Sequence, residues 1–421
     1  MRTYQLPLDL VRERSPERPV ALVRPRSVSV AARWFQDNLK ADVFYAVKAN
    51  PSRWVIETLV EEGVNAFDVA SLAEIELVRS VSPDARLAFM HPVKSRGAIR
   101  AAYADHGVRT FVLDSHDELQ KILDATGGAD DLNLLVRMAV SADGAAYSLS
   151  GKFGVSTDQA PALLLATRRA VKEGLMGVCF HVGSQCMRPT AYQAAMAQVG
   201  RAILRAGVIV DIVDIGGGFP SVYPGMVPPD MSEYADAIHR GFNEMPVSET
   251  TELWCEPGRA LVAESSSILA RVDLRKGDAL YLNDGSYGSL FDATHSRWPF
   301  PTKLVRDGEA ASDLKAFQFY GPTCDSIDHM PGPFWLPVDV REGDFIEIGM
   351  LGAYGVAMST GFNGYGEHDI AAVEDAPMAS LYGLAPRSIP TVRTTAEENA
   401  RKVVRLSRPK GKAGQRKSRR K

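Results

Sequence analysis

The stretch Phe44-Tyr45-Ala46-Val47-Lys48-Ala49-Asn50-Pro51 is an apolar run that reaches a lysine and is then stopped by Asn-Pro. The run predicts a buried strand, and the residue before a proline avoids the helical conformation, so a helix does not follow directly. We therefore expect an ammonium at the C-terminal end of a strand, where desolvation lowers its pKa and frees a nucleophilic amine. Such a lysine suits a Schiff-base enzyme. The alternative is an ordinary strand-end lysine that reaches solvent.

Outward from Lys48, short apolar runs alternate with amphipathic segments. The predicted strands cover residues 43–49, 66–70, 87–92, 110–114, 133–138, 178–183, 212–216 and 252–256. The predicted helices between them cover residues 53–62, 72–81, 95–106, 117–125, 161–172, 191–205 and 231–242. Strands that alternate with helices in this way indicate a parallel sheet that is buried on both faces. Eight such units over roughly 215 residues predict a (β/α)₈ barrel, with a doubly wound sheet as the competing arrangement.

The pattern changes after residue 259. Strand-like runs at 267–274, 279–284, 316–320 and 344–348 follow without long helices between them, and Gly and Pro are frequent. This pattern predicts a mostly antiparallel β-domain, which a strand-like run at residues 4–10 joins. The predicted fold class is α/β, a (β/α)₈ TIM barrel with a second domain. The barrel covers residues 22–258, and residues 1–21 and 259–385 form the β-domain.

The composition is that of a globular protein, with 45% hydrophobic and 24% charged residues. Residues 1–14 lack the continuous apolar core of a signal peptide, and no later stretch is long enough to span a bilayer. None of the four cysteines belongs to a CxxC pair, so no metal site is predicted. So few cysteines in a large chain predict a cytoplasmic protein.

The charge is unevenly distributed. Residues 401–421 hold 11 Lys or Arg and no acid, which leaves −14 on the rest of a chain whose total is −3. Residues 386–421 are therefore predicted to be a basic, disordered tail. Contact of this tail with nucleic acid is an alternative, but nucleic-acid binding is not expected as the function of the whole protein.

Polar residues fall at the C-terminal ends of the predicted barrel strands, which is where barrel enzymes carry their active sites. The strand ends supply Lys48, Asp68, Arg137, His181, Ser184, Gly216-Gly217-Gly218, Glu256 and Arg259. The repeated position predicts that these residues share one site.

Each of these features has two interpretations. The amides of Gly216-Gly217-Gly218 can converge on a phosphate, or the glycines can serve a turn with positive φ. A carboxylate such as Glu256 in a barrel mouth must be paired, either with a protonated pyridine nitrogen or with a barrel arginine. His181 can stack on a flat cofactor ring, with Ser184 on a phosphate, or it can be hydrogen-bonded in the core.

Three further motifs lie in the predicted β-domain. Gly321-Pro322-Thr323-Cys324-Asp325-Ser326 places a thiol beside a carboxylate in a turn, where the thiol can donate a proton and the carboxylate can hold a cation. The alternative is an ordinary turn with a small buried cysteine. Tyr354 and the segment Phe362-Asn363-Gly364-Tyr365 are aromatic residues flanked by glycine.

Taken together, these strings resemble the fold-type III pyridoxal-phosphate decarboxylases, the group of ornithine, diaminopimelate and arginine decarboxylases. The matching segments are FYAVKAN, FDVAS, HVGSQ, DIGGGFP, EPGR, NDGSYGS, GPTCDS, GAYG and FNGY, in the family's order. The resemblance implies an alanine-racemase-like TIM barrel and pyridoxal 5'-phosphate as the cofactor.

By this resemblance, Lys48 carries the cofactor as a Schiff base, His181 stacks on the pyridine ring and Glu256 keeps the pyridine nitrogen protonated. Asp68 and Arg137 match family positions near the cofactor. The implied phosphate ligands are Ser184, Gly217, Gly218, Arg259 and Tyr354.

The resemblance also assigns the β-domain motifs. Cys324 stands at the family position for the donor that protonates Cα after CO₂ leaves, and Asp325 matches the residue that binds the distal ammonium of the substrate. In the family these residues come from the partner subunit of a head-to-tail homodimer with shared active sites. Phe362 is implied at the same interface.

The sequence looks closest to ornithine/lysine decarboxylases, so the expected reaction is L-ornithine to putrescine, with L-lysine to cadaverine as a further activity in polyamine biosynthesis. Asp325 attracts an amine and repels a distal carboxylate. Eukaryotic ornithine decarboxylases carry a second acidic residue where an ungapped count places Ser296. Asp292 is a possible substitute one helical turn earlier, and Arg297 is equally suited to a carboxylate.

Several alternatives stay open on the sequence alone. Diaminopimelate or carboxynorspermidine decarboxylase is the first, because HVGSQ resembles the diaminopimelate branch as well. An alanine-racemase-like enzyme is another, although it needs a catalytic tyrosine in place of Cys324-Asp325. The last is a non-catalytic homologue, against which the presence of Lys48, Glu256 and Cys324 speaks.

Overall fold

The computed structural model describes residues 1–141, 144–147 and 151–384, all of which fall within one compact unit. The predicted tail at residues 386–421 lies outside the described residues. Within the described ranges, no helix is long and apolar enough to cross a membrane.

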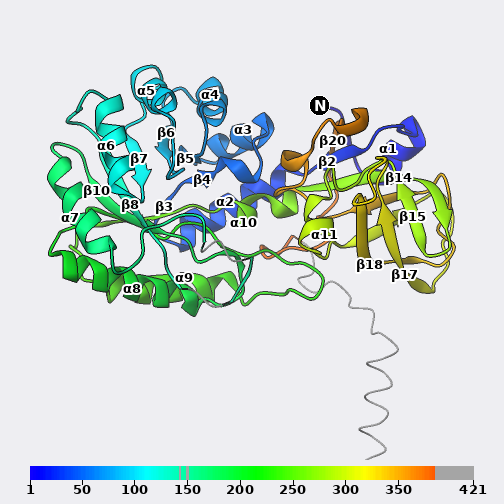
Figure 1. Ribbon diagram of the computed structural model, residues 1–421. Helices are drawn as coiled ribbons and strands as arrows, with labels where there is room; N and C mark the ends of the chain where they lie inside the picture. The colour runs from blue at the N-terminus through cyan, green and yellow to red at the C-terminus, as the bar shows by residue number, and fades with distance from the viewer. Residues whose placement is uncertain (142–143, 148–150, 385–421) are drawn as a thin grey trace, which may run out of the picture. The chain divides into compact units, whose positions relative to one another are not determined.

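A parallel sheet forms the first part of the fold (Figure 1). Its strands are β3 (Asp42–Val43), β4 (Tyr45–Ala46), β5 (Ala66–Val69), β6 (Arg86–Phe89), β7 (Thr110–Leu113), β8 (Asn133–Met138), β10 (Met176–Phe180), β12 (Ile212–Asp214) and β13 (Glu252–Cys255). The order starts at β3 and ends at β4, and only Phe44 separates these two. The first and last strands in this order are therefore neighbours along the chain, so the sheet closes into a barrel. The predicted eight-unit barrel is confirmed.

Helices cover the outside of the barrel (Figure 1). They are α3 (Arg53–Glu61), α4 (Leu72–Val81), α5 (Arg96–Ala104), α6 (His116–Ala125), α7 (Ala160–Ala170), α8 (Thr190–Ala206) and α9 (Met231–Asn243). Three of them begin at a serine, Ser71, Ser95 or Ser115, whose hydroxyl accepts a backbone N–H of the first turn. The seven helices match the predicted segments within a few residues, because apolar stripes and capping serines can be recognised in a sequence.

The inside of the barrel is closed by apolar side chains at the amino-terminal ends of the strands. Phe44 and Trp254 stack there with ring centroids 4.4 Å apart. They belong to one buried cluster with residues of other strands, such as Val112, Leu135 and Ile212. With this end packed, the carboxyl-terminal end is left as the open mouth of the barrel.

The second sheet is mostly antiparallel, as predicted. Its strands are β1 (Thr3–Tyr4), β2 (Val20–Val23), β14 (Ser266–Lys276), β15 (Ala279–Leu282), β16 (Thr302–Val305), β17 (Leu314–Tyr320), β18 (His329–Pro337), β19 (Phe345–Ile348) and β20 (Asp369–Val373). Strand β14 pairs antiparallel with β2, β15 and β19, whereas β20 pairs parallel with β1 and β2. The N-terminal segment thus contributes two strands to this sheet.

One predicted strand is wrong. Residues 4–10 were expected to be extended, but only Thr3–Tyr4 are, and α1 (Pro7–Arg14) follows. Proline is well tolerated in the first turn of a helix, and the Asp9 carboxylate accepts the N–H of Leu6 at 3.0 Å. The helix buries Leu10 against the second sheet, so tertiary packing decides the conformation of this short apolar run.

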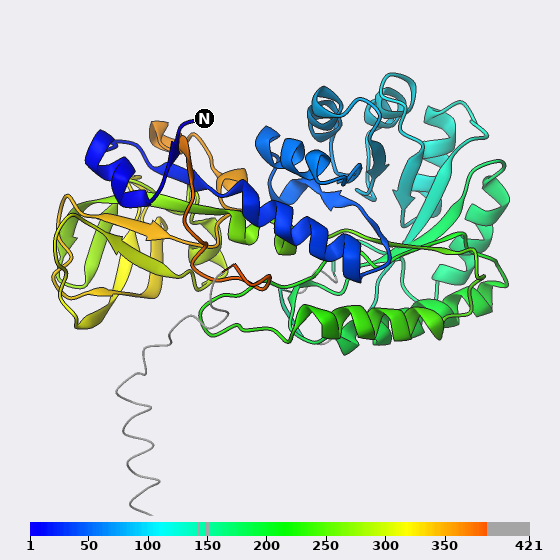
Figure 2. The ribbon, with the colours of Figure 1, turned by 180° about the vertical axis from the view of Figure 1, so that it is seen from behind.

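Several contacts join the barrel to the segments on either side of it. Helix α2 (Pro25–Asn38) contacts α3 and also α10 (Arg259–Val262) (Figure 2). Near the barrel mouth, the Asn50 side chain donates to the Gly352 carbonyl at 2.9 Å, and the Tyr354 N–H donates to the Ala49 carbonyl at 2.8 Å. The division into domains at residues 22, 258 and 385 stays a prediction.

Candidate active site

A pocket of about 230 Å³ lies at the C-terminal ends of the barrel strands. It brings together most of the residues expected there, from five barrel strands, from β11 (Ser184–Cys186) and from the segment that follows β19. Those in its lining are Lys48, Arg137, His181, Ser184, Gly217, Gly218, Glu256, Arg259 and Tyr354.

Lys48 follows β4 in a 3₁₀ turn, η1 (Val47–Ala49), rather than in the strand itself. Its Nζ lies 2.5 Å from Oδ2 of the buried Asp68. Burial by itself lowers the pKa of Lys48, but the nearby Asp68 and Glu256 carboxylates outweigh it, and the pKa is raised. The expected lowering of this pKa is therefore wrong for the ligand-free chain, in which Lys48 is a paired ammonium.

Glu256 is a buried carboxyl group with one oxygen that lacks a donor. Its Oε1 has no hydrogen-bond partner among the described residues. Burial, and then the charge of Asp214 close by, raise the pKa of Glu256 well above its usual value, and burial raises the pKa of Asp214 to about 6. Two buried carboxyl groups this close together need a cation or a shared proton, and an N–H on a bound ligand meets this need.

His181 is held as a neutral imidazole. Its Nδ1 accepts the backbone N–H of Gly183 at 2.9 Å, which leaves the proton of the neutral ring on Nε2. Burial, followed by the charges of Arg137 and Lys48, lowers its pKa to about 3. A neutral, fixed ring in the pocket wall can pack against a flat ligand without adding charge.

The glycines after β12 form a cradle that side chains would fill. A Cβ on Gly217 would lie 2.7 Å from the Glu256 carbonyl oxygen. Gly218 has a φ of +97°, and its Cβ would lie 2.5 Å from the Gly183 carbonyl oxygen. Only glycine fits these two positions, and the bare backbone leaves room for a ligand to approach the amides.

Arg259 is a buried cation with no carboxylate bonded to it among the described residues. Its Nη1 donates to Tyr223 Oη at 3.0 Å and its Nη2 to Ser184 Oγ at 3.4 Å, while its buried Nε has no partner. Its guanidinium also lies 5.0 Å from the ring centroid of Tyr354. A buried arginine with donors to spare, beside the glycine cradle, is suited to a phosphate group.

These features fit the cofactor that the sequence indicates. The Arg259 donors and the cradle suit a phosphate, the free Glu256 oxygen suits a ring nitrogen that carries a proton, and Lys48 suits a carbonyl group. The orphaned polar atoms of Glu256 and Arg259 lie where such a ligand supplies their partners.

Among the lining residues that were not predicted are His91, Lys152 and Phe153. The Phe153 ring lies 5.2 Å from the His91 ring and 5.6 Å from the Arg137 guanidinium carbon, so it organises this wall of the pocket. His91 ends a predicted strand as His181 does, and that signal was available in the sequence. The two loop residues carry no such signal.

Apart from Tyr354, the β-domain candidates do not line this pocket. Cys324 is exposed, Phe362 has 44% of its surface exposed, and Asp325 is partly exposed. They gather with Tyr287 and Asn363 in a separate group, which we call the Asp325 cluster (Tyr287, Cys324, Asp325, Phe362 and Asn363). Tyr287 Oη donates to Asp325 Oδ2 at 2.6 Å, and the Cys324 N–H donates to Asn363 Oδ1 at 3.0 Å.

Asp292 and Ser296 also lie outside the pocket lining. Asp292 belongs to the short helix α11 (Phe291–His295), where burial raises its pKa and the nearby Arg259 opposes this rise. Ser296 caps the end of the helix and is exposed. The structure therefore does not bring these two residues to Lys48.

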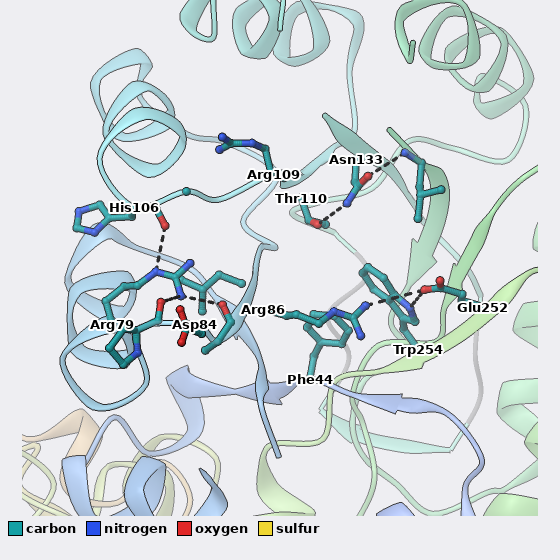
Figure 3. A pocket seen from close by; sticks show the side chains of 15 residues that line it. Phe44, Arg79, Asp84, Arg86, His106, Arg109, Thr110, Asn133, Glu252 and Trp254 are labelled. Carbon is teal, nitrogen blue, oxygen red and sulfur yellow. Dashed lines mark hydrogen bonds and ion pairs between the residues drawn. The ribbon is translucent and has the colours of Figure 1, made fainter. Parts of the chain in front are cut away.

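A larger cavity of about 500 Å³ lies at the opposite end of the barrel (Figure 3). There the Arg86 guanidinium sits over the Phe44 and Trp254 rings, and Trp254 Nε1 donates to Glu252 at 2.8 Å. None of the unpartnered buried polar atoms of the described residues lies in its lining. The Lys48 pocket, which holds such atoms of Glu256 and Arg259, is therefore the candidate site.

Comparison with known proteins identifies relatives. Residues 26–263 match the family described as pyridoxal-dependent decarboxylase, pyridoxal binding domain. The chain is 32% identical over 346 residues to the lysine/ornithine decarboxylase of Selenomonas ruminantium, a match that covers 80% of this chain and 85% of that protein.

Two solved structures are similar over most of the chain. The lysine/ornithine decarboxylase of Vibrio vulnificus, complexed with cadaverine, aligns with a TM-score of 0.74 and 30% identity over 87% of this chain and 96% of the other. The arginine decarboxylase of Paramecium bursaria Chlorella virus, bound to agmatine, aligns with a TM-score of 0.77 and 27% identity over 86% and 98%.

Proposed function

Because this chain belongs to the pyridoxal-dependent decarboxylase family and is a pyridoxal-phosphate enzyme, we propose that it decarboxylates L-ornithine to putrescine. L-Lysine, which gives cadaverine, is proposed as a second substrate, and both reactions belong to polyamine biosynthesis. The relatives named above act on lysine, ornithine or arginine, which supports a substrate with a basic side chain. The free cysteines support a cytoplasmic location.

One observation carries the substrate proposal: Asp325 presents an ionised carboxylate in an exposed cluster. The hydrogen bond from Tyr287 lowers the pKa of Asp325. A carboxylate that stays charged attracts the distal ammonium of ornithine or lysine and repels a distal carboxylate such as that of diaminopimelate.

Bound pyridoxal phosphate supplies an electron-poor ring that accepts the charge left behind when the substrate carboxylate departs as CO₂. The chain's residues have simpler tasks in the proposed mechanism. Asp68, which is 2.5 Å from Lys48 Nζ, is placed to take the proton that the ammonium must lose before its amine can bond. Glu256 would hold a proton on the ring nitrogen of the bound cofactor, and the neutral His181 would pack against the ring without competing for that proton.

We further propose that two chains form a head-to-tail homodimer with shared active sites. The described lining of the Lys48 pocket contains no cysteine, whereas Cys324 and Asp325 lie outside it. A second copy can bring its Asp325 cluster to the pocket, where the Cys324 thiol donates the proton to Cα.

The experiment that tests the function is a side-by-side measurement of CO₂ release from ornithine, lysine, arginine and meso-diaminopimelate. We expect the highest kcat/KM with ornithine, followed by lysine. A preference for diaminopimelate contradicts the substrate proposal, and formation of a D-amino acid without CO₂ contradicts decarboxylation itself.

A further inference from the structure

Tyr287 holds the Asp325 carboxylate in one orientation. Its hydroxyl donates to Oδ2 at 2.6 Å, and the Ile327 N–H donates to Oδ1 at 3.1 Å. Each carboxylate oxygen is thus held once and keeps a lone pair for another donor. A carboxylate on an exposed loop otherwise samples several rotamers, so these two bonds fix the direction in which it meets a cation.

Tyr287 is itself held on two sides. Its ring packs on Phe362 with centroids 4.8 Å apart, and its carbonyl accepts the Thr360 N–H at 2.8 Å. The phenol is therefore aimed at Asp325 by contacts with the segment that carries Phe362, and not by its own rotamer preference alone.

A buried carboxylate joins the loop of Tyr287 to the loop of Asp325. Asp328 Oδ1 accepts the Ser286 N–H at 2.7 Å and the Ser286 hydroxyl at 3.0 Å. Its Oδ2 accepts the Thr323 hydroxyl at 2.7 Å and the Thr323 N–H at 3.1 Å. Four donors from the neighbours of Tyr287 and Cys324 converge on one residue, so the two loops form a fixed frame.

We propose that Tyr287 is a positioning residue for substrate recognition, which acts through Asp325 to orient and keep ionised the carboxylate that binds the distal ammonium. The inference rests on the proposed function, since it needs a substrate with an amine at its far end. It assigns to the tyrosine of the NDGSYGS segment a role that is separate from cofactor binding.

The test is Tyr287→Phe in the cofactor-loaded full chain, because phenylalanine keeps the ring on Phe362 and removes only the hydroxyl. We expect KM for L-ornithine to rise about three- to tenfold while kcat changes less than about twofold, as for loss of one hydrogen bond to a charged group. KM for L-norvaline, which lacks the distal amine, should not change. Loss of kcat with an unchanged KM overturns the proposal.

The pH dependence gives a second readout. The Tyr287 hydrogen bond is the largest influence that lowers the pKa of Asp325. Removing the hydroxyl raises that pKa, so the acid limb of kcat/KM for ornithine should move to higher pH in Tyr287→Phe. A purely structural role for the tyrosine leaves this limb in place and contradicts the inference.

A double-mutant cycle separates this inference from the proposed function. If Tyr287 acts through Asp325, then adding Tyr287→Phe to Asp325→Asn should not raise KM further. An equal rise in both backgrounds overturns the inference and leaves the function intact. A wild-type chain that releases no CO₂ from any basic amino acid overturns both.

The matched control is Tyr281→Phe. Tyr281 lies in β15, its ring stacks on Tyr320 with centroids 5.1 Å apart, and its hydroxyl makes no hydrogen bond within the described chain. The same loss of a hydroxyl there should leave KM, kcat and the acid limb unchanged. Equal shifts in Tyr281→Phe and Tyr287→Phe show a general effect and overturn the assignment.

Discussion

At the scale of single residues, the charge state of Lys48 depends on its neighbours. The structure pairs its ammonium with Asp68, with Glu256 also near. The sequence places a lysine at the end of a strand but does not show which carboxylates fold against it. That is why the expected direction of its pKa was wrong while its position in the pocket was right.

Replacing Lys48 by alanine should abolish covalent attachment of the cofactor. Borohydride reduction followed by mass spectrometry should find the cofactor on Lys48 in the wild-type chain and nowhere in Lys48→Ala, with loss of at least about a thousandfold in kcat. Lys303→Ala, which removes an exposed lysine on β16, serves as the control. Reduced cofactor on another residue of Lys48→Ala would contradict the assignment.

Most site residues are predictable because they share one sequence position, the end of a barrel strand. His181, Glu256 and Arg259 were found in this way and lie in one lining. Tyr287 was not singled out, because its role depends on a hydrogen bond between segments 38 residues apart. Lys152 and Phe153 were not predicted for a related reason. They lie in a loop, which has no hydrophobic periodicity from which the direction of a side chain can be inferred.

At the scale of elements, the cradle after β12 depends on backbone conformation. Gly218→Ala places a Cβ 2.5 Å from the Gly183 carbonyl oxygen at a φ of +97°. We expect affinity for the cofactor to fall at least about tenfold, because the backbone must move in the cradle that is proposed to bind the phosphate. Cofactor titration followed by absorbance measures this change.

Gly225→Ala is a matched control for that substitution. Gly225 also has a positive φ, +76°, but open space surrounds its missing Cβ. Both variants carry backbone strain and only Gly218→Ala clashes with the cradle. Equal losses of cofactor affinity would show that strain alone, and not the cradle, is responsible.

The buried carboxyl group of Glu264 holds the segment before residue 385 through a hydrogen bond. Glu264 Oε1 accepts the Leu381 N–H at 2.6 Å, its Oε2 has no partner among the described residues, and Tyr382 Oη donates to the Ala260 carbonyl at 2.8 Å. Burial raises the pKa of Glu264 to about 7. The folded chain therefore binds this proton more tightly than the unfolded chain does.

This linkage predicts a pH effect of defined sign. The contribution of protonated Glu264 to stability is fully present below its ordinary pKa, near 4.5, and is lost as the pH rises toward 7. Glu264→Gln mimics the protonated form, so it should be more stable than wild type by about 1–3 kcal/mol at pH 8 and equal near pH 4. Urea unfolding at both pH values measures the difference. A constant offset would contradict the prediction.

Elements were easier to predict than their ends. All eight predicted barrel strands correspond to strands of the barrel sheet, the first of them to both β3 and β4, because parallel strands between helices are continuous apolar runs. The short β1 and the helix α1 were not, since a run of seven residues fits either conformation until it packs. Strand β18 was missed as well, because two internal prolines obscure its period.

At the scale of the whole molecule, the proposed homodimer with shared active sites predicts complementation between inactive subunits. Lys48→Ala and Cys324→Ala should each be inactive or slow alone. When they are mixed and allowed to exchange, up to about a quarter of the sites become intact, because half of the dimers are mixed and each holds one good site. Activity of the mixture measures this recovery.

The control for complementation is a chain that carries both substitutions. When this doubly substituted chain is mixed with wild type, mixed dimers also form, but one subunit of each mixed dimer carries both substitutions. Mixing it with Lys48→Ala alone should restore nothing. No recovery from the two single variants, at equal cofactor loading, would contradict shared sites.

The bond between the Tyr354 N–H and the Ala49 carbonyl also concerns the order of synthesis. The chain emerges from the ribosome with Lys48 early and Tyr354 late, and β13 must arrive before the barrel can close on β3. In a nascent chain, Lys48 is therefore present before one wall of its pocket, which is translated some 300 residues later. A truncated chain released before Tyr354 carries the nucleophile but lacks this wall of the pocket, so the complete lining forms only after Tyr354 has been translated.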